Sequence, residues 1–286
     1  QIKKQVTKKT LDMIEALAEE KPDEFAAFWE GFGKVLKEGL HVDPANKDRL
    51  AGICRWRSSK GEGLTSLAQY VERMKEGQEQ IYFVTGPTLD FCAKSPHIEG
   101  LKAKGYEVLY FVDAVDEWVA MALPEFEGKK LVSAMKGSID LGDDEGEKPD
   151  AEAFDALTKA MKGVLEDRIS DVRLTDRLTD SPVCLVAGEH DAGANLERIL
   201  QAAGQAAPSS KRALELNAKH PLIANLQGIA SKGGEEQFAL LKEWTELLHD
   251  QALLTEGSPI ADPADFARRM NALLLGASGN ALEGLA

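Results

Sequence analysis

The chain is short of the residue types on which several common functions depend. Its three cysteines, Cys54, Cys92 and Cys184, are odd in number and far apart. This argues against a disulfide framework and a paired-cysteine zinc site, and it favours a reducing, cytoplasmic compartment. No apolar run approaches the roughly eighteen residues that a membrane helix needs. The N-terminus reads as a basic helix rather than the apolar core of a signal peptide, so no membrane partner is expected.

Basic residues are also scarce relative to acidic ones. The sequence has 34 Lys and Arg residues against 48 Asp and Glu residues, which gives a formal net charge of −14. Clustered Lys and Arg bind nucleic acids, so no nucleic-acid partner is expected. The hydrophobic share of 43% and the charged share of 29% are typical of a folded globular protein. A chain of 286 residues is long enough for two domains with separate cores.

The sequence shows no convergent set of catalytic groups. Its five histidines are scattered singly, without a HExxH pair, and neither the GxSxG motif nor the P-loop motif occurs. The segment GEHDAG, residues 188–193, follows a predicted strand, but Glu189 and Asp191 would repel a phosphate there. We therefore assign no catalytic residue and no metal ligand.

A strand–helix–strand pattern is the most regular feature of the first half. The apolar run from Ile81 to Val84 stops before Gly86, which predicts a buried strand that enters a tight turn. Pro96 at a first helical position predicts a helix over 96–104, and the run from Val108 to Val112 predicts a second strand. Together they predict a βαβ unit with two parallel strands.

Helical periodicity dominates residues 1–57. Leu11 and Ile14 recur on one face, and a second helix that begins near Pro22 carries an aromatic stripe. Three packed helices are therefore predicted. The composition of SSKGEG, residues 58–63, predicts a loop.

The second half begins after an acidic segment. Residues 140–150 concentrate acidic groups, Gly and Pro, and they are the best candidate for a domain boundary. A helix over 151–166 and short strands that include 183–186 and 213–216 predict a small α/β or α+β domain. A further helix near 192–203 has a short apolar stripe, which burial in the same chain would explain equally well. That stripe comprises Leu196, Ile199 and Leu200.

The last fifty residues return to helical periodicity. Two amphipathic helices joined through the loop from Gly257 to Pro263 predict a hairpin, and two copies of it could complete a four-helix-bundle dimer. The pattern leaves open whether the apolar faces pack on the same chain or on a second copy. The residues predicted for a dimer interface are Leu241, Trp244, Leu247, Leu248, Leu254, Phe266, Met270, Leu273 and Leu274.

Acidic residues and a tryptophan begin another predicted helix. Asp113, Asp116 and Glu117 are expected on a solvated face, as charge clusters in acidic chains usually are. Trp118 either packs in the core or, with Met121, offers an adaptable contact to an apolar segment of another protein.

Several long blocks of this sequence resemble the heat shock protein 90 family of chaperones, and its bacterial members in particular. The blocks are FWEGFGKVLKEGL from Phe28, YVERMKEGQEQIYFVTG from Tyr70, SPHIEGLKAKGYEVLYFVDAVDEW from Ser95, LPEFEGKKLVS from Leu123, RLTDSPVCLV from Arg177, LELNAKHPLI from Leu214 and LLHDQALLTEGSPIADPADFARRMNALL from Leu247. The resemblance extends over nearly the whole chain.

This resemblance implies a chaperone fragment of the α/β (α+β) multi-domain class. It implies a three-helix segment at 1–65 and a small α/β module at 66–141, both from the family's middle domain, and a C-terminal dimerisation domain at 142–286. ATP and magnesium would bind in the family's N-terminal domain, whose motifs have no counterpart here. The arginine that reaches the ATP γ-phosphate would lie just upstream of Gln1, so no ATPase activity is expected of this fragment.

The resemblance also implies where client polypeptides bind. Family members use an acidic–Trp pair in the small module and an amphipathic helix in the C-terminal domain. The implied client-binding residues are Glu117, Trp118, Met121, Leu196, Ile199 and Leu200. Bacterial relatives carry methionine where this sequence has Ala192 and Leu196, which makes the helix surface less adaptable. The C-terminal residues EGLA lack the acidic pentapeptide that docks helical-repeat co-chaperones.

Two other functions remain open from the residues alone. One is an enzyme that uses the loops of the α/β module, as many α/β folds do at strand ends. The other is a structural dimerisation module that binds no clients. A ligand beside Gly86 or Gly188 would favour the enzyme, and protection of Trp118 by a client would favour the chaperone.

Overall fold

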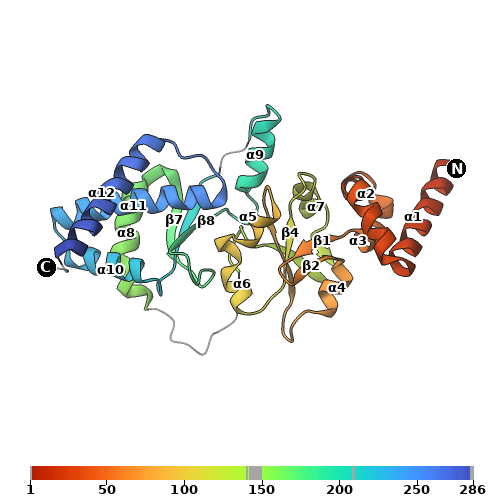
Figure 1. Cartoon of the computed structure of the whole chain (residues 1–286), viewed down its shortest axis with the longest axis horizontal. Helices are drawn as coiled ribbons and strands as arrows, with labels where there is room; N and C mark the ends of the chain where they lie inside the picture. The colour runs from red at the N-terminus through yellow and green to blue at the C-terminus, as the bar shows by residue number, and fades with distance from the viewer. Residues whose placement is uncertain (1, 140, 142–149, 208–209, 284–286) are drawn as a thin grey trace. The chain divides into compact units, whose positions relative to one another are not determined.

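The computed structural model describes residues 2–139, 141, 150–207 and 210–283 (Figure 1). The chain divides into two compact units. The first unit comprises Gln1–Lys94 and Leu101–Ala134, and the second comprises Ser95–Gly100 and Met135–Ala286. The predicted boundary at 140–150 lies almost entirely outside the described residues. The finer division into three domains stays a prediction.

The first unit begins with three helices and continues as a mixed sheet covered by short helices. The predicted three-helix segment is confirmed by α1 (Ile2–Glu20), α2 (Pro22–Val42) and α3 (Lys47–Ile53). The sheet follows in the order β2-β1-β4-β3-β6-β5. Its strands are β1 (Trp56–Ser58), β2 (Gly61–Thr65), β3 (Gln80–Thr85), β4 (Val108–Phe111), β5 (Glu125–Phe126) and β6 (Lys129–Ser133). The short helices of this half are α4 (Leu67–Glu72), α5 (Leu89–Ala93), α6 (Glu99–Ala103) and α7 (Asp116–Ala122).

The predicted βαβ unit is present, with one difference in its helix. Strands β3 and β4 pair in parallel, with Tyr82 opposite Val108 and Thr85 opposite Phe111. The segment predicted as one helix over 96–104 is a 3-10 turn at Pro96–Ile98 followed by α6. The Ser95 hydroxyl does not cap a backbone N–H there, because it lies 3.1 Å from Nδ1 of the buried His97 instead.

The loop predicted at 58–63 is wrong, because those residues take part in a β-hairpin. Strand β1 pairs antiparallel with β2, with Ser58 opposite Gly61, so only Ser59 and Lys60 form the turn. Strand β1 also pairs with β4, and the Trp56 ring stacks on Phe111 at 5.2 Å between centroids. The Gly-rich composition predicts a loop, but pairing with the neighbouring strands and burial of Trp56 favour the hairpin.

The second unit is a small mixed sheet covered by helices. The sheet order is β7-β9-β8, in which β9 pairs in parallel with β7 and antiparallel with β8. The elements are α8 (Asp155–Leu165), β7 (Ile169–Leu174), β8 (Val183–Val186), α9 (Ala194–Ala202), β9 (Arg212–Leu216), α10 (Pro221–Lys232), α11 (Glu235–Glu256) and α12 (Pro263–Glu283). Helices α8, α10 and α11 bury Leu157, Leu226 and Leu248 against the apolar face of the sheet.

The predicted terminal hairpin is confirmed by α11 and α12. Helix α11 ends at Gly257, which adopts the left-handed conformation (φ 82°) that favours glycine, and α12 begins at Pro263. Both helices are drawn in blue in Figure 1. Among the described residues, no helix is long and apolar enough to cross a membrane.

Candidate functional site

The N-terminus of α7 is fixed by a buried ion-pair cluster. The Lys37 ammonium, on α2, donates to Asp113 Oδ2 at 2.9 Å and to Asp116 Oδ2 at 3.0 Å. The Trp56 indole N–H donates to Asp116 Oδ1 at 3.0 Å, and the backbone N–H of Asp113 donates to Asp116 Oδ2. Lys34 adds an exposed contact to Asp113 at 3.1 Å. Helix α7 is therefore held against α2 and β1.

The prediction of a solvated acidic face is wrong for two of the three carboxylates. Asp116 has no exposed surface and Glu117 is 5% exposed. Burial raises the pKa of Asp116 above its usual range, because desolvation outweighs the attraction of Lys37. Burial also tends to raise the pKa of Asp113, but the charges and hydrogen bonds of Lys37 and Lys34 lower it by more. The pKa of Asp113 therefore lies below its usual range. Sequence reasoning could not find Lys37, which is 79 residues from Asp116.

Three predicted client-binding residues lie on α7 with very different exposure. Glu117 is buried, Trp118 is half-buried and the Met121 side chain is 60% exposed. The next apolar positions, Val119 and Leu123, are buried in the core. Helix α7 thus presents a partly open aromatic ring and an open thioether on a firmly anchored frame.

The other three predicted client-binding residues lie on α9 in the second unit. Leu196, Ile199 and Leu200 are all half-buried, so this stripe is neither a closed core nor a fully open surface. Glu197 on the same helix pairs with Arg212 of β9. The Arg212 guanidinium also donates to Glu256 Oε1 at 2.9 Å, at the end of α11. One arginine therefore holds α9 to the sheet and to α11.

The cluster around Arg212 makes stability depend on pH. Burial raises the pKa of the Glu256 carboxyl to about 7, since desolvation outweighs Arg212 and the Ser258 hydroxyl, and Glu197 raises it further. The folded chain therefore holds a proton on Glu256 that the unfolded chain has lost between pH 4.5 and 7. This contribution to stability falls as pH rises through that window, by roughly 3 kcal/mol at most.

We expect the substitution Glu256→Gln to remove this dependence. Relative to the original chain, the variant should become more stable as the pH is raised from 5 to 8, measured by urea unfolding at each pH. Burial lowers the pKa of His249 to about 4, which gives an opposing trend below pH 6.5, but that trend is common to both proteins. The exposed Glu189→Gln is the matched control. If the difference in unfolding free energy between Glu256→Gln and the original chain stayed constant from pH 5 to 8, Glu256 would not be the source of the pH dependence.

The residues predicted for a dimer interface fall into two groups. The first group is buried within the same chain: Leu241, Leu247 and Leu248 are buried, and the half-buried Trp244 packs against the core that contains Leu241 and Leu248. The second group lies at the end of α11 and along α12. Leu254, Met270 and Leu274 are 49%, 37% and 59% exposed, while Phe266 and Leu273 are half-buried. Leu275, which sequence reasoning did not include, is 74% exposed.

Helix α12 is held to α11 mainly by charged side chains. Arg269 lies among acidic groups of both helices: it pairs with Asp265 and contacts Asp250 at 3.3 Å and Glu246 at 3.9 Å. Among the large apolar side chains described on α12, Met270, Leu274 and Leu275 are exposed, and Phe266 and Leu273 are half-buried. Such a surface, continuous along one helix, is typical of a protein–protein interface.

Reactive and metal-ligating groups do not converge in the described part of the chain. Cys54, Cys92 and Cys184 are free and buried, and burial raises the pKa of the Cys54 and Cys92 thiols to about 12. No group of three or more His, Cys, Asp or Glu side chains among the described residues is arranged to hold a metal ion.

Comparison with known proteins gives consistent matches. A model of the family described as "Hsp90 protein" matches residues 1–282. The chaperone protein HtpG of Myxococcus xanthus is 52% identical over 279 residues, which cover 96% of this chain and 42% of that protein. HtpG proteins of Aromatoleum aromaticum and Magnetococcus marinus are 48% and 46% identical, again over 96% of this chain and over 43% and 44% of their own lengths. The chain thus spans about two-fifths of the length of the curated relatives it matches.

Proposed function

Because this chain belongs to the Hsp90 protein family, we propose that it is part of a molecular chaperone and that its own role is non-covalent. It offers apolar contacts to partly folded client proteins and associates with a second copy of itself. Its compartment is the cytoplasm, and its partners include neither nucleic acids nor membranes. The sequence reasoning and the names of its relatives support this role.

The observation that carries the client-binding proposal is the exposure of α7. A half-buried Trp118 and a 60% exposed Met121 lie on a helix whose first turn is held by Lys37 and Trp56. An aromatic ring and a thioether can adapt to many apolar segments. The anchored first turn keeps both side chains in place, which limits the entropy lost on binding.

Helix α9 is the second proposed contact. Its Leu196, Ile199 and Leu200 are half-buried, and Glu197 on the same helix pairs with Arg212 of β9. This stripe is therefore less exposed than the α7 surface, where Met121 is 60% exposed. We therefore expect α7 to make the larger contribution to client affinity.

Hydrogen exchange with and without an unfolded client tests this proposal. Amide protons around Trp118 and around Leu200 should exchange more slowly when the client is present. A structural module that only dimerises would show protection in α12 alone, independent of the client. Unchanged exchange at both helices with a client that demonstrably associates with the chain would contradict the proposal.

We place ATP and magnesium binding outside these 286 residues, because none of them matches the nucleotide-binding motifs of the family. This chain then has no enzymatic activity of its own. In the whole protein, nucleotide binding would shift the population of conformations of the client-binding surfaces rather than supply chemistry here. The alternative of an enzyme built on the loops of the first unit has no support from relatives, which are named as chaperones.

A further inference from the structure

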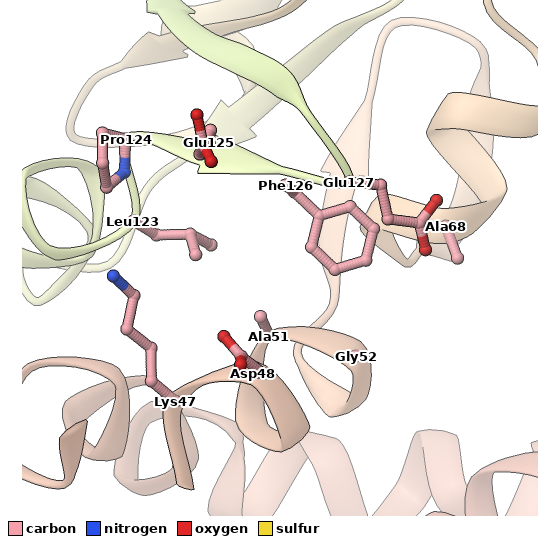
Figure 2. Close-up of a pocket in the computed structure, with 10 residues that line it drawn as sticks. All are labelled: Lys47, Asp48, Ala51, Gly52, Ala68, Leu123, Pro124, Glu125, Phe126 and Glu127. Carbon is pink, nitrogen blue, oxygen red and sulfur yellow. The ribbon is translucent and has the colours of Figure 1, made fainter. Parts of the chain in front are cut away.

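A cleft in the first unit lies between α3 and the segment that follows α7. Its volume is about 670 Å³, within the range of binding sites for peptides and small molecules. Figure 2 shows the Leu123 side chain and the Phe126 ring directed into it from one side and Ala51 from the other, with Ala68 at one end. Its apolar floor would hold one large side chain.

The rim of this cleft carries an excess of negative charge. Lys47, Asp48, Glu125 and Glu127 line it, which gives one cation against three carboxylates. None of these four forms an ion pair or side-chain hydrogen bond with another described residue. In Figure 2, Lys47 lies at the end near Leu123 and Pro124, and Glu127 lies at the opposite end near Ala68. An acidic rim around an apolar floor suits a ligand with an apolar group next to a basic one.

The cleft is also bordered by the edge of a sheet. Strand β5 is the last strand in the sheet order and pairs only with β6 among the described strands. Its two residues, Glu125 and Phe126, both line the cleft. An edge strand can accept an added strand from another chain, in which main-chain hydrogen bonds give affinity and side-chain pockets give specificity.

From the cleft, its charge and the open edge, we propose that the first unit binds an extended segment of a partner protein at this site. The segment carries a large apolar residue and, two positions along, a Lys or Arg. Side chains two apart in a strand face the same side and are separated by about 6.6 Å, so both enter the cleft. The apolar side chain contacts Leu123 and Phe126, and the basic one faces Asp48 and Glu127.

This site does not depend on the proposed client contact at Trp118. None of the residues that line the cleft belongs to α7 or α9. The substitution Trp118→Ala should therefore leave binding at the cleft unchanged, so failure of either proposal can be recognised separately.

Dye-labelled peptides measured by fluorescence anisotropy test the site. The probe is Gly-Thr-Phe-Thr-Lys-Thr-Gly. One control places Phe and Lys next to each other, and the other replaces Lys with Glu. The probe should bind about tenfold more tightly than the Glu peptide, as expected for reversing one charge beside two carboxylates. Equal affinity for the three peptides would overturn the proposal, as would no binding of the probe at millimolar concentration.

A cleft-filling variant connects binding to this location. Gly52 lines the cleft, and a side chain added there would meet no atom within 4 Å. Gly52→Leu should fold normally and abolish probe binding. Gly31→Leu, at an exposed and equally open position on α2, is the matched control and should bind normally. Normal probe binding by Gly52→Leu would overturn the proposal. The proposal would also fail if this variant changed self-association and left peptide binding unchanged.

A second variant tests the acidic rim without loss of stability. Glu127 has a φ of 49°, a backbone conformation that glycine adopts more readily, so Glu127→Gly removes a carboxylate and relieves strain. Its melting temperature should stay the same or rise while probe affinity falls. Glu166→Gly relieves the same kind of strain (φ 45°) in the second unit and should leave affinity unchanged. Equal affinity for the two variants would show that Glu127 takes no part, contrary to the proposal.

Discussion

Replacing Lys37 with methionine is expected to destabilise the first unit by about 3–5 kcal/mol, because it leaves a buried carboxylate without its cation. The Lys37 side chain is 4% exposed and its partner Asp116 is 1% exposed. After the substitution, the donors to Asp116 among the described residues would be the Trp56 indole N–H and the backbone N–H of Asp113. Urea unfolding followed by tryptophan fluorescence measures the loss.

A neighbouring lysine provides the matched control. Lys34 contacts the same cluster through Asp113 but is 77% exposed. Lys34→Met should therefore cost no more than about 1 kcal/mol, as is usual for an exposed ion pair. Similar losses of unfolding free energy for the two lysine variants would contradict the view that burial makes the contribution of Lys37 to stability large.

The pH dependence of the Lys37→Met variant follows from the same desolvation. Burial already holds the pKa of Asp116 above its usual range. The positive charge of Lys37 lowers this pKa, so removing Lys37 should raise it further. The folded state then binds a proton more readily than the unfolded state, so part of the lost stability returns as the pH falls. The double variant Lys37→Met with Asp116→Asn should recover stability at neutral pH.

Replacing Leu274 with glutamate is expected to weaken self-association about a hundredfold, which corresponds to close to 3 kcal/mol at a central interface position. Leu274 is 59% exposed in this chain, on the face of α12 that also carries Met270. A charge there would have to be buried on association without a partner. Sedimentation or light scattering over a range of concentrations measures the dissociation constant.

Leu240→Glu is the control for this experiment. Leu240 is 43% exposed on α11 and is not among the residues predicted for the interface. It should leave the dissociation constant unchanged, and neither variant should lower the melting temperature of the monomer. Self-association through α12 would be contradicted if the original chain were monomeric at tens of micromolar. It would also be contradicted if both variants changed the dissociation constant equally.

The elements that sequence reasoning predicted are those with a strong local pattern. The apolar run from Ile81 to Val84 and the periodicity of the last two helices correspond to β3 and to α11 and α12. The hairpin of β1 and β2 is not predicted because the composition of residues 58–63 indicates a loop, whereas the pairing of β1 with β4 depends on a segment distant in sequence. Helix α10 is absent from the prediction, although Pro221 at its first position is a residue type favoured at the start of a helix.

The candidate site was predictable only in part, for a related reason. Periodicity and the family resemblance drew attention to Trp118 and Met121, but they could not give the exposure of either side chain. Burial of Asp116 depends on Lys37 and Trp56, which are distant in sequence and carry no local signal. The acidic cleft beside Phe126 likewise combines α3 with a segment more than seventy residues later.

The central claim is that α7 binds unfolded polypeptide, and the most direct test is the affinity of α7 variants for a permanently unfolded protein such as reduced, carboxymethylated lactalbumin. The combined variant Trp118→Ala and Met121→Ala should bind it about tenfold more weakly, with a melting temperature close to that of the original chain. Met13→Ala, at a methionine of similar exposure on α1 (66% against 60%), should bind normally. Unchanged affinity of the α7 variant, or a loss of affinity explained by a large drop in melting temperature, would contradict the claim.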